Sequence, residues 1–179
     1  MIPDCTQISD LHTPLRLCGL TERLNSESVR CRIAECCNEP TIYNRLFRRM
    51  LNDRNYLPTD AAGFINWAAK GWSEQTHYVF VALDSDGLPV ASCDLKTATR
   101  GDDEIGYWRS TQVPGSMTAI VAQMLSLAIA DGFTRFHAYV EPINFGSVAV
   151  LERLGFRLET RDDATGRHLY RRCSAEQIG

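Results

Sequence analysis

The sequence predicts a mixed α/β (α+β) fold in one domain that spans residues 1–179. Two observations predict this class: runs rich in β-branched and aromatic residues are typical of strands, and amphipathic helical stretches lie between them. The composition agrees, since 44% apolar and 23% charged residues are ordinary for a folded domain and exclude disorder over most of the chain. A chain of this length buries about two-thirds of its unfolded surface, which allows a sizeable core.

The first half of the chain is predicted to be mainly helical. A strand is expected at Leu15–Leu20, after a polar N-terminus, and a long helical region follows over about residues 26–75. Apolar residues recur there at helical spacing. The pair Thr59-Asp60 is typical of an N-cap that opens a further helix within this region.

The second half is predicted to alternate between strands and helices. A polar turn at residues 84–87 joins its first two strands into a hairpin, and another turn is expected at residues 163–166. Strands are expected at residues 77–83, 90–96, 104–108, 135–140, 156–161 and 168–172, and helices at residues 117–130 and 144–155. This order predicts a mixed sheet with helices against its faces.

The net charge and the cysteines limit which class of protein this can be. The formal net charge is −3, so the broad basic surface of a nucleic-acid-binding protein is not expected. Seven cysteines at irregular spacing, and no apolar core of signal-peptide length within Met1–Asp10, predict free thiols in a reducing, cytoplasmic compartment. Neither the cysteines nor the four histidines have metal-ligand spacing, so no metal site is expected. No apolar run has the length of about 20 residues that a membrane helix needs.

A glycine-containing loop precedes the helix at residues 117–130. The loop and helix start read Gln112-Val113-Pro114-Gly115-Ser116-Met117-Thr118. A loop that enters a helix presents unpaired N–H groups and the positive end of the helix dipole, which together bind phosphate. Gly115 permits close backbone approach, and the hydroxyls of Ser116 and Thr118 are additional donors. An ordinary helix-start loop is the alternative interpretation.

The string from Glu141 to Phe156 is more specific. It contains N-x-x-S-x-x-V-L-x-x-L-G-F, beginning at Asn144, and through it the chain resembles the GCN5-related N-acetyltransferases (the GNAT superfamily). It is most similar to the RimJ/RimL branch, which acetylates the N-termini of ribosomal proteins. Glu104-Ile105-Gly106-Tyr107-Trp108 resembles the strand E-I-G-Y-W of that branch. The resemblance covers about residues 15–20 and 78–172 and leaves out the helices where acceptor specificity is usually built.

The resemblance implies a GNAT fold, whose mostly antiparallel sheet has two splayed strands that form a cleft for acetyl-CoA. Main-chain groups of Tyr107, Trp108 and Arg109 would pair with the pantetheine arm. Asn144 would orient the cofactor. The pyrophosphate would be held by backbone N–H groups of Val113, Gly115, Ser116, Met117 and Thr118.

The resemblance also implies direct attack of a primary amine on the thioester, so that proximity supplies much of the rate. The tyrosine that many GNAT enzymes use as an acid is replaced by Leu151, and Ser147 is the acid or thiol-side donor in the RimJ/RimL branch. Asp162 stands at the position of that branch's glutamate base. Glu104 and Glu141 are competing bases. A tight helix contact for Ser147 and a turn-forming role for Asp162 are the structural alternatives.

Two departures from the family loop leave other functions open. Met117 replaces a small residue, and a long side chain there could crowd the pyrophosphate; Pro114 removes one N–H. The main hypothesis is an N-acetyltransferase acting on a protein N-terminus or a small amine, as a monomer or homodimer. The alternatives are a non-catalytic CoA- or protein-binding module and a toxin-like enzyme that acetylates aminoacyl-tRNA, which the acidic balance argues against.

Overall fold

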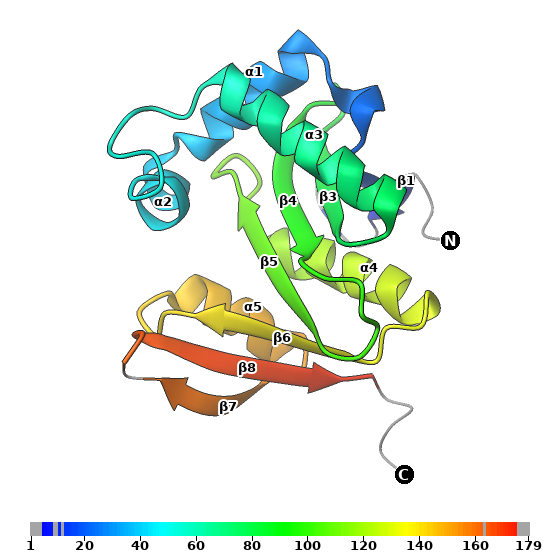
Figure 1. Cartoon of the computed structure of the whole chain (residues 1–179), viewed down its shortest axis with the longest axis vertical. Coiled ribbons are helices and arrows are strands. Elements are labelled where there is room, and N and C mark those ends of the chain that lie inside the picture. The colour runs from blue at the N-terminus through cyan, green and yellow to red at the C-terminus, as the bar shows by residue number, and fades with distance from the viewer. Residues whose placement is uncertain (1–4, 9–10, 12, 163, 175–179) are drawn as a thin grey trace.

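An eight-stranded mixed sheet forms the centre of the protein (Figure 1). The computed structural model describes residues 5–8, 11, 13–162 and 164–174. The strand order is β1-β2-β3-β4-β5-β6-β8-β7, and every neighbouring pair is antiparallel except β5 and β6. The strands are β1 (Cys5–Ile8), β2 (Leu15–Gly19), β3 (Tyr78–Leu83), β4 (Pro89–Leu95), β5 (Asp103–Arg109), β6 (Arg135–Val140), β7 (Arg157–Asp162) and β8 (Arg167–Cys173).

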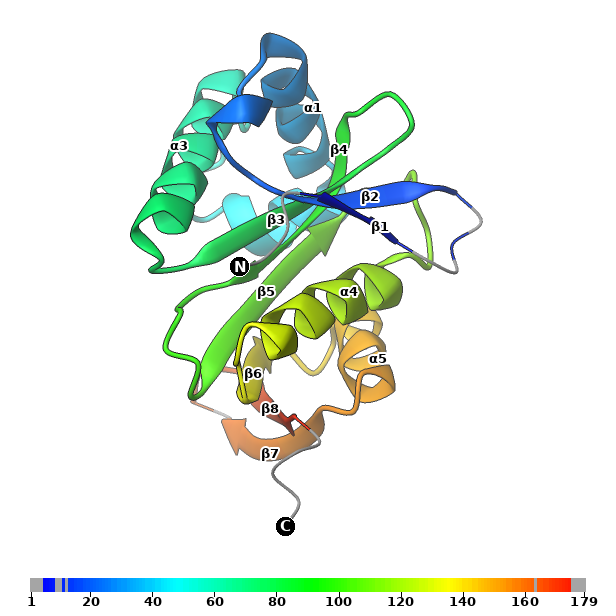
Figure 2. The same ribbon diagram turned by 90° about the vertical axis from the view of Figure 1, so that its right-hand side faces the viewer.

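Helices cover both faces of this sheet. α1 and α3 pack on one face, and α4 packs on the other, as the side view shows (Figure 2). The helices are α1 (Glu27–Cys37), α2 (Pro40–Ile42), α3 (Pro58–Glu74), α4 (Met117–Ala130) and α5 (Phe145–Arg153), with a 3-10 turn at Glu22–Leu24 and a π-helical turn at Tyr43–Phe47. The predicted fold class is thereby confirmed.

Alternation along β3 explains why the sheet has two buried faces. Phe80 and Ala82 point into the core under α4, whereas Val79 and Val81 point into the core under α1 and α3. Successive side chains of a strand point to opposite faces, so a strand that is apolar throughout must be covered on both. Each fully buried aliphatic or aromatic side chain contributes roughly 1.5–3 kcal/mol.

The sheet opens between β5 and β6. These parallel strands pair only at their N-terminal ends, through Asp103 opposite Phe136 and Glu104 opposite His137. Beyond that point the strands diverge, and β5 runs away from β6 toward α2 (Figure 1). The divergence leaves the side of β5 that faces β6 without a strand partner from Gly106 onward.

Two expectations about the N-terminal part of the chain, its secondary structure and its free thiols, differ from the structure. Cys5–Ile8 forms an additional edge strand, β1, where only a polar N-terminus was expected. Cys5 lies directly opposite Cys18 of β2, and the two form a disulfide, so the expectation that all cysteine thiols are free was wrong for this pair. A four-residue strand has too little periodicity to be recognised from sequence, and strand register decides which cysteines meet. Cys31, Cys36, Cys37, Cys93 and Cys173 are free.

The helical region after residue 26 is less continuous than expected. It breaks between the π-helical turn and α3, where Asn52 and Asp53 adopt positive φ values of 50° and 64°. The N-cap of α3 is Leu57, not Thr59-Asp60 as expected, and Pro58 occupies the first helical position. Asp60 caps the helix from its third position, because its carboxylate accepts a hydrogen bond from the Leu57 N–H at 2.8 Å.

In the second half of the chain the expected elements agree with the structure to within one or two residues. The helix expected at residues 117–130 is α4, and the strand expected at residues 135–140 is β6. Asn144 is the N-cap of α5, as its position before the apolar periodicity predicts. The turn expected at residues 163–166 joins β7 to β8, although residue 163 lies outside the described part of the chain. Within the described residues, no helix is long and apolar enough to cross a membrane.

Candidate active site

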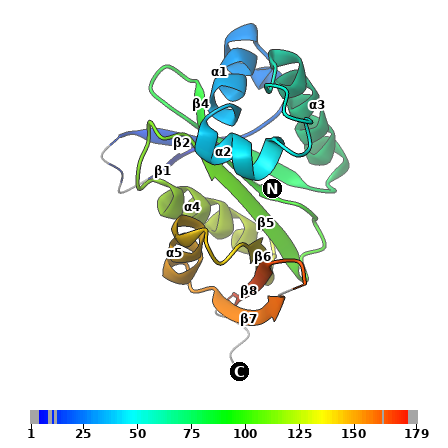
Figure 3. The same cartoon turned by 90° about the vertical axis from the view of Figure 1, so that its left-hand side faces the viewer.

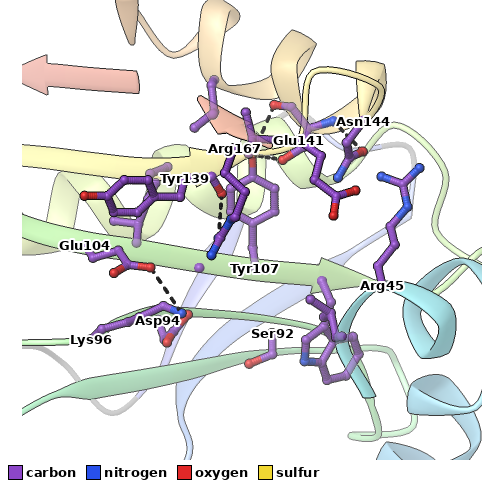
Figure 4. A pocket seen from close by; sticks show the side chains of 18 of the residues that line it. Arg45, Ser92, Asp94, Lys96, Glu104, Tyr107, Tyr139, Glu141, Asn144 and Arg167 are labelled. Atoms are coloured by element: carbon purple, nitrogen blue, oxygen red, sulfur yellow. Dashed lines mark hydrogen bonds and ion pairs between the residues drawn. The ribbon is translucent and has the colours of Figure 1, made fainter. Parts of the chain in front are cut away.

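A cleft of about 520 Å³ opens where β5 and β6 diverge. Its walls come from β4, β5 and β6, from the start of α5, and from the π-helical turn and α3, with α2 and α5 on either side of the C-terminal end of β5 (Figure 3). The polar and charged side chains that line it are Arg45, Ser92, Asp94, Lys96, Glu104, Tyr107, Tyr139, Glu141, Asn144, Ser147 and Arg167 (Figure 4). Phe47, Phe64 and Trp108 add aromatic surface to the same cleft.

Ser147 lies in the first turn of α5 and faces this cleft. Asn144 holds the turn, because its Oδ1 accepts a hydrogen bond from the Ser147 N–H at 3.3 Å. The Ser147 hydroxyl lies 2.7 Å from the hydroxyl of Tyr107, which reaches across from β5. Leu151, one turn later, also lines the cleft, and Tyr107 and Tyr139 are the tyrosines of this cleft among the described residues.

Two of the carboxylates predicted as bases line the cleft. The Glu104 carboxylate lies 3.4 Å from the ammonium group of Lys96, and this ion pair spans neighbouring strands. Glu141 follows β6 and is exposed near Arg45 and Arg167 (Figure 4). Both are therefore within the cleft that contains Ser147.

A third carboxylate of the cleft, Asp94, was not found from the sequence. It is half-buried on β4, opposite Gly106 of β5. Burial raises the pKa of Asp94, the negative charge of Glu104 raises it further, and Lys96 and the Gly106 N–H lower it. An aspartate between two apolar strand positions is unusual, since Asp is rare within strands, and it could have been noticed from the sequence. The sequence does not indicate, however, that its side chain faces a cleft.

Asp162 lies apart from the cleft, at the end of β7. Its carboxylate accepts hydrogen bonds from the Thr165 N–H, the Thr165 hydroxyl and the Ala164 N–H at 2.8–3.1 Å. The hydrogen bonds from Thr165 hold the pKa of Asp162 below its usual range. These contacts are those of a turn-forming aspartate and make the carboxylate a weaker proton acceptor.

The loop before α4 also lies outside the residues that line the cleft. Gly115 has a φ of +77°, which favours glycine, and the Ser116 hydroxyl donates to the Val113 carbonyl at 2.7 Å. Ser116 therefore folds the loop and does not point its hydroxyl outward. The Met117 side chain is 6% exposed and packs in the core, so it leaves the outer side of the loop free. Thr118 follows in the first turn of α4, whose N–H groups have no acceptor within the helix.

Glu39, which the sequence did not single out, lies between α1 and α2 and connects this loop to them. Its carboxylate accepts hydrogen bonds from the Ser110 hydroxyl at 2.5 Å and from the Thr111 N–H at 2.7 Å. Arg109, predicted to contact the cofactor, donates from its guanidinium to the Ser110 carbonyl at 2.8 Å and is not among the residues that line the cleft. The cleft thus brings together six predicted site residues: Glu104, Tyr107, Trp108, Glu141, Asn144 and Ser147.

The cleft has no evident metal-ligand set. Among the residues that the structure describes, no group of three or more His, Cys, Asp or Glu side chains has a geometry that could hold a metal ion.

Solved structures show the same fold. RimJ from Mycobacterium smegmatis in complex with CoA-disulfide superposes with a TM-score of 0.73 at 21% identity, over 98% of this chain and 89% of that chain. A putative ribosomal-protein-serine acetyltransferase from Vibrio cholerae gives 0.70 at 20% identity, over 97% and 100% of the two chains. The ribosomal-protein-S5-alanine acetyltransferase from Vibrio fischeri gives 0.69 at 15% identity, over 97% and 100%.

Sequence comparison gives the family. No protein of curated function matches the chain in sequence. The family model of the acetyltransferase (GNAT) domain matches residues 25–157, which is most of the chain and includes β5, α4, β6 and α5. The resemblance drawn from residues 104–108 and 144–156 is therefore confirmed, and the protein is an acyltransferase that belongs to the GNAT acetyltransferase family.

Proposed function

We propose that this protein transfers the acetyl group of acetyl-CoA to a primary amine, on a protein N-terminus or a small molecule. The observation that carries the proposal is the position of Ser147, which faces the cleft at the β5–β6 divergence together with three carboxylates. The structural neighbours include a complex with CoA-disulfide and ribosomal-protein acetyltransferases, which supports both the donor and the amine acceptor.

The donor would run along the unpaired side of β5. The peptide groups of Tyr107 and Trp108 are paired with β4 on one side only, so the opposite side can pair with the pantetheine arm as a further strand would. The pyrophosphate would lie at the start of α4, where the N–H groups of the first helical turn, including those of Met117 and Thr118, and the helix dipole favour an anion. The buried Met117 side chain does not obstruct this path.

The reaction needs a proton acceptor and a stabilised leaving group. An ammonium substrate must first lose a proton, and the neutral amine then attacks the thioester carbon, forming the C–N bond. The C–S bond breaks with its electron pair left on sulfur, and the nitrogen, which is positively charged after the attack, releases its second proton to solvent or to the thiolate. A hydroxyl donor such as Ser147 stabilises the thiolate as its charge develops, which is worth most in a cleft shielded from water.

We propose that the proton acceptor is a carboxylate of the cleft. A base works best when its pKa approaches the working pH, and the pKa of Asp94 is shifted in that direction by burial and by Glu104. Glu104 forms an ion pair with Lys96, and Glu141 is exposed. Asp162, the remaining candidate, is engaged by its own turn.

Binding and turnover test this proposal in two steps. Calorimetric titration with acetyl-CoA is expected to show binding, and a panel of N-terminal peptides and small amines is expected to yield acetylated product. Absence of binding at sub-millimolar acetyl-CoA would contradict the hypothesis that the protein is an acetyltransferase. Binding without thioester cleavage would favour the non-catalytic module, and label on aminoacyl-tRNA would favour the toxin-like enzyme.

Variants separate the proposed roles. Ser147→Ala is expected to lower kcat while leaving acetyl-CoA affinity nearly unchanged, whereas Asn144→Ala is expected to weaken cofactor binding. The isosteric changes D94N, E104Q, E141Q and D162N are compared through their kcat/KM profiles against pH. The base is the residue whose amide variant removes the acidic limb of the profile, and retention of that limb in all four variants would exclude a carboxylate base.

The cytoplasmic location and the monomeric or homodimeric state also belong to this proposal. The disulfide between Cys5 and Cys18 provides a test of this location, because such bonds are rare in a reducing cytoplasm. Alkylation of free thiols in intact cells, followed by mass spectrometry, measures whether this pair is reduced where the protein resides. Light scattering at several protein concentrations measures the oligomeric state.

A further inference from the structure

We propose that Tyr107 is a positioning residue that aims the Ser147 hydroxyl at the departing sulfur of coenzyme A. The inference rests on the proposed function and names a partner for the serine that the family resemblance does not supply. The resemblance implies only a main-chain role for Tyr107, through its peptide groups on β5. The side chain gives it a second role.

The geometry brings the two hydroxyl groups together. Tyr107 and Ser147 are 40 residues apart, and the Tyr107 ring rises from β5 toward the start of α5 (Figure 4). The two hydroxyl oxygens lie 2.7 Å apart, and the Tyr107 hydroxyl also donates to the Ser147 carbonyl at 3.1 Å. Both residues line the cleft, so this contact lies within the site.

The number of hydrogens on the two hydroxyl groups limits which hydrogen bonds they can form together. The phenol has one hydrogen, and a carbonyl oxygen can only accept. When the phenol donates to the Ser147 carbonyl, the serine hydroxyl can donate to the phenol oxygen, and this is its resting orientation. When the phenol donates to the serine oxygen instead, the serine hydrogen must point elsewhere, and the open direction is the cleft. Tyr107 therefore selects between a resting and an outward orientation of the Ser147 hydroxyl.

The outward orientation is favoured once charge develops on sulfur. As the C–S bond breaks, the electron pair remains on sulfur, and the serine hydrogen turns toward this charge. The phenol then donates to the serine oxygen, so the two hydrogen bonds polarise each other. Burial raises the pKa of Tyr107 to about 12, whereas an ordinary thiol has a pKa of about 8.5. The phenol therefore keeps its proton, and no proton needs to be transferred from either hydroxyl.

The alternative is that Tyr107 only anchors the first turn of α5 through the Ser147 carbonyl. That role would affect folding or cofactor binding, but it would not depend on the serine hydroxyl. Tyr107→Phe removes one oxygen and leaves the ring in place, so it is suited to separate the two roles. Tyr170→Phe removes the same atom from a buried tyrosine of β8 outside the cleft and is the matched control.

The experiment is a double-mutant cycle on kcat with the variants Y107F, S147A and Y107F/S147A, with thermal melting to verify folding. We expect Y107F to lower kcat about tenfold, the loss typical of one hydrogen bond formed to developing charge, with KM for acetyl-CoA changed by less than about twofold. The double variant is expected to match S147A within about twofold, because Tyr107 acts through Ser147. Y170F is expected to retain the wild-type kcat.

Three results would overturn the inference. The first is a wild-type kcat for Y107F. The second is a kcat of the double variant that is lowered by the product of the two single-variant losses. The third is a Y107F variant in which KM for acetyl-CoA rises while kcat stays constant. No acetyl transfer by the wild-type protein would instead show that the proposed function itself is at fault, and a wild-type rate for S147A would show that the proposed role of Ser147, on which the inference rests, is at fault. The two failures are therefore distinguishable.

Discussion

At the scale of single residues, the pair formed by Asp94 and Gly106 explains a glycine in the middle of a strand. The two face each other across β4 and β5, and a Cβ on residue 106 would lie 2.5 Å from the Asp94 Oδ1. Any side chain at residue 106 would therefore displace the carboxylate. The glycine of the E-I-G-Y-W strand makes room for a group on the neighbouring strand in this protein.

The Asp94 carboxylate has a consequence for stability that depends on pH. Because its pKa is raised in the folded protein, the folded state holds the proton more tightly, and stability falls as pH rises through the folded pKa. Asp94→Asn is uncharged and should therefore melt at a higher temperature than wild type at pH 7. The difference should disappear near the ordinary aspartate value of 3.8.

Thermal melting at both pH values checks this prediction, with Asp86→Asn in the exposed β3–β4 turn as the control. The control is expected to change the free energy of unfolding by less than about 0.5 kcal/mol at either pH. A D94N variant that is less stable than wild type at pH 7 would contradict the prediction, because it would mean that the charged form is stabilised in the cleft.

At the scale of elements, α3 contains two glycines whose substitution should have opposite effects. A Cβ on Gly71 would lie 2.4 Å from the His77 Nε2, whereas a Cβ on Gly63 would meet no atom within 4 Å. The His77 ring cannot easily move, because it stacks on Trp67 with centroids 4.0 Å apart and hydrogen bonds to the Trp67 carbonyl at 3.1 Å. Gly71 thus sets the distance between α3 and the residue that precedes β3.

We expect Gly71→Ala to destabilise the fold by about 1–3 kcal/mol, the usual cost of overpacking. Gly63→Ala in the same helix should stabilise it by about 0.5–1 kcal/mol, because alanine has the higher helix propensity. Urea unfolding of both variants measures the difference. Equal effects of the two substitutions would mean that the contact with His77 does not constrain α3.

At the scale of the whole molecule, the disulfide between Cys5 and Cys18 acts on the unfolded chain. It closes a loop with a sequence separation of 13 and fastens the edge strand β1 to the sheet. A cross-link over such a loop removes conformations from the unfolded ensemble, which stabilises the folded state by roughly 2–3 kcal/mol.

Reduction should therefore lower the free energy of unfolding of the wild-type protein by that amount. Cys5→Ser should show the lower value with or without reductant. Cys173→Ser, which removes an exposed free thiol, is the matched control and should respond to reductant as the wild type does. Guanidinium unfolding with and without reductant measures these free energies. An unfolding curve of the wild-type protein that is unchanged by reductant would exclude a stabilising disulfide.

The sequence by itself determined the features whose signals are local. Asn144 and Ser147 are three residues apart on one helical turn, and the string that contains them identified the family and one wall of the site. The strands and helices of the second half followed from periodicities of two and 3.6 residues, which are set by the backbone. Glu104 and Glu141 were predicted beside the cleft because each lies on or directly after a strand that forms it.

Only the tertiary structure decided the contacts between distant segments. Tyr107 reaches Ser147, Asp94 enters the cleft, and Cys5 meets Cys18 because strand register and the β5–β6 divergence bring them together. The burial of the Met117 side chain was decided in the same way, by how α4 packs on the sheet. A one-residue change of register moves every side chain of a strand to the other face, and the register between strands depends on partner strands and turns outside each strand's own sequence.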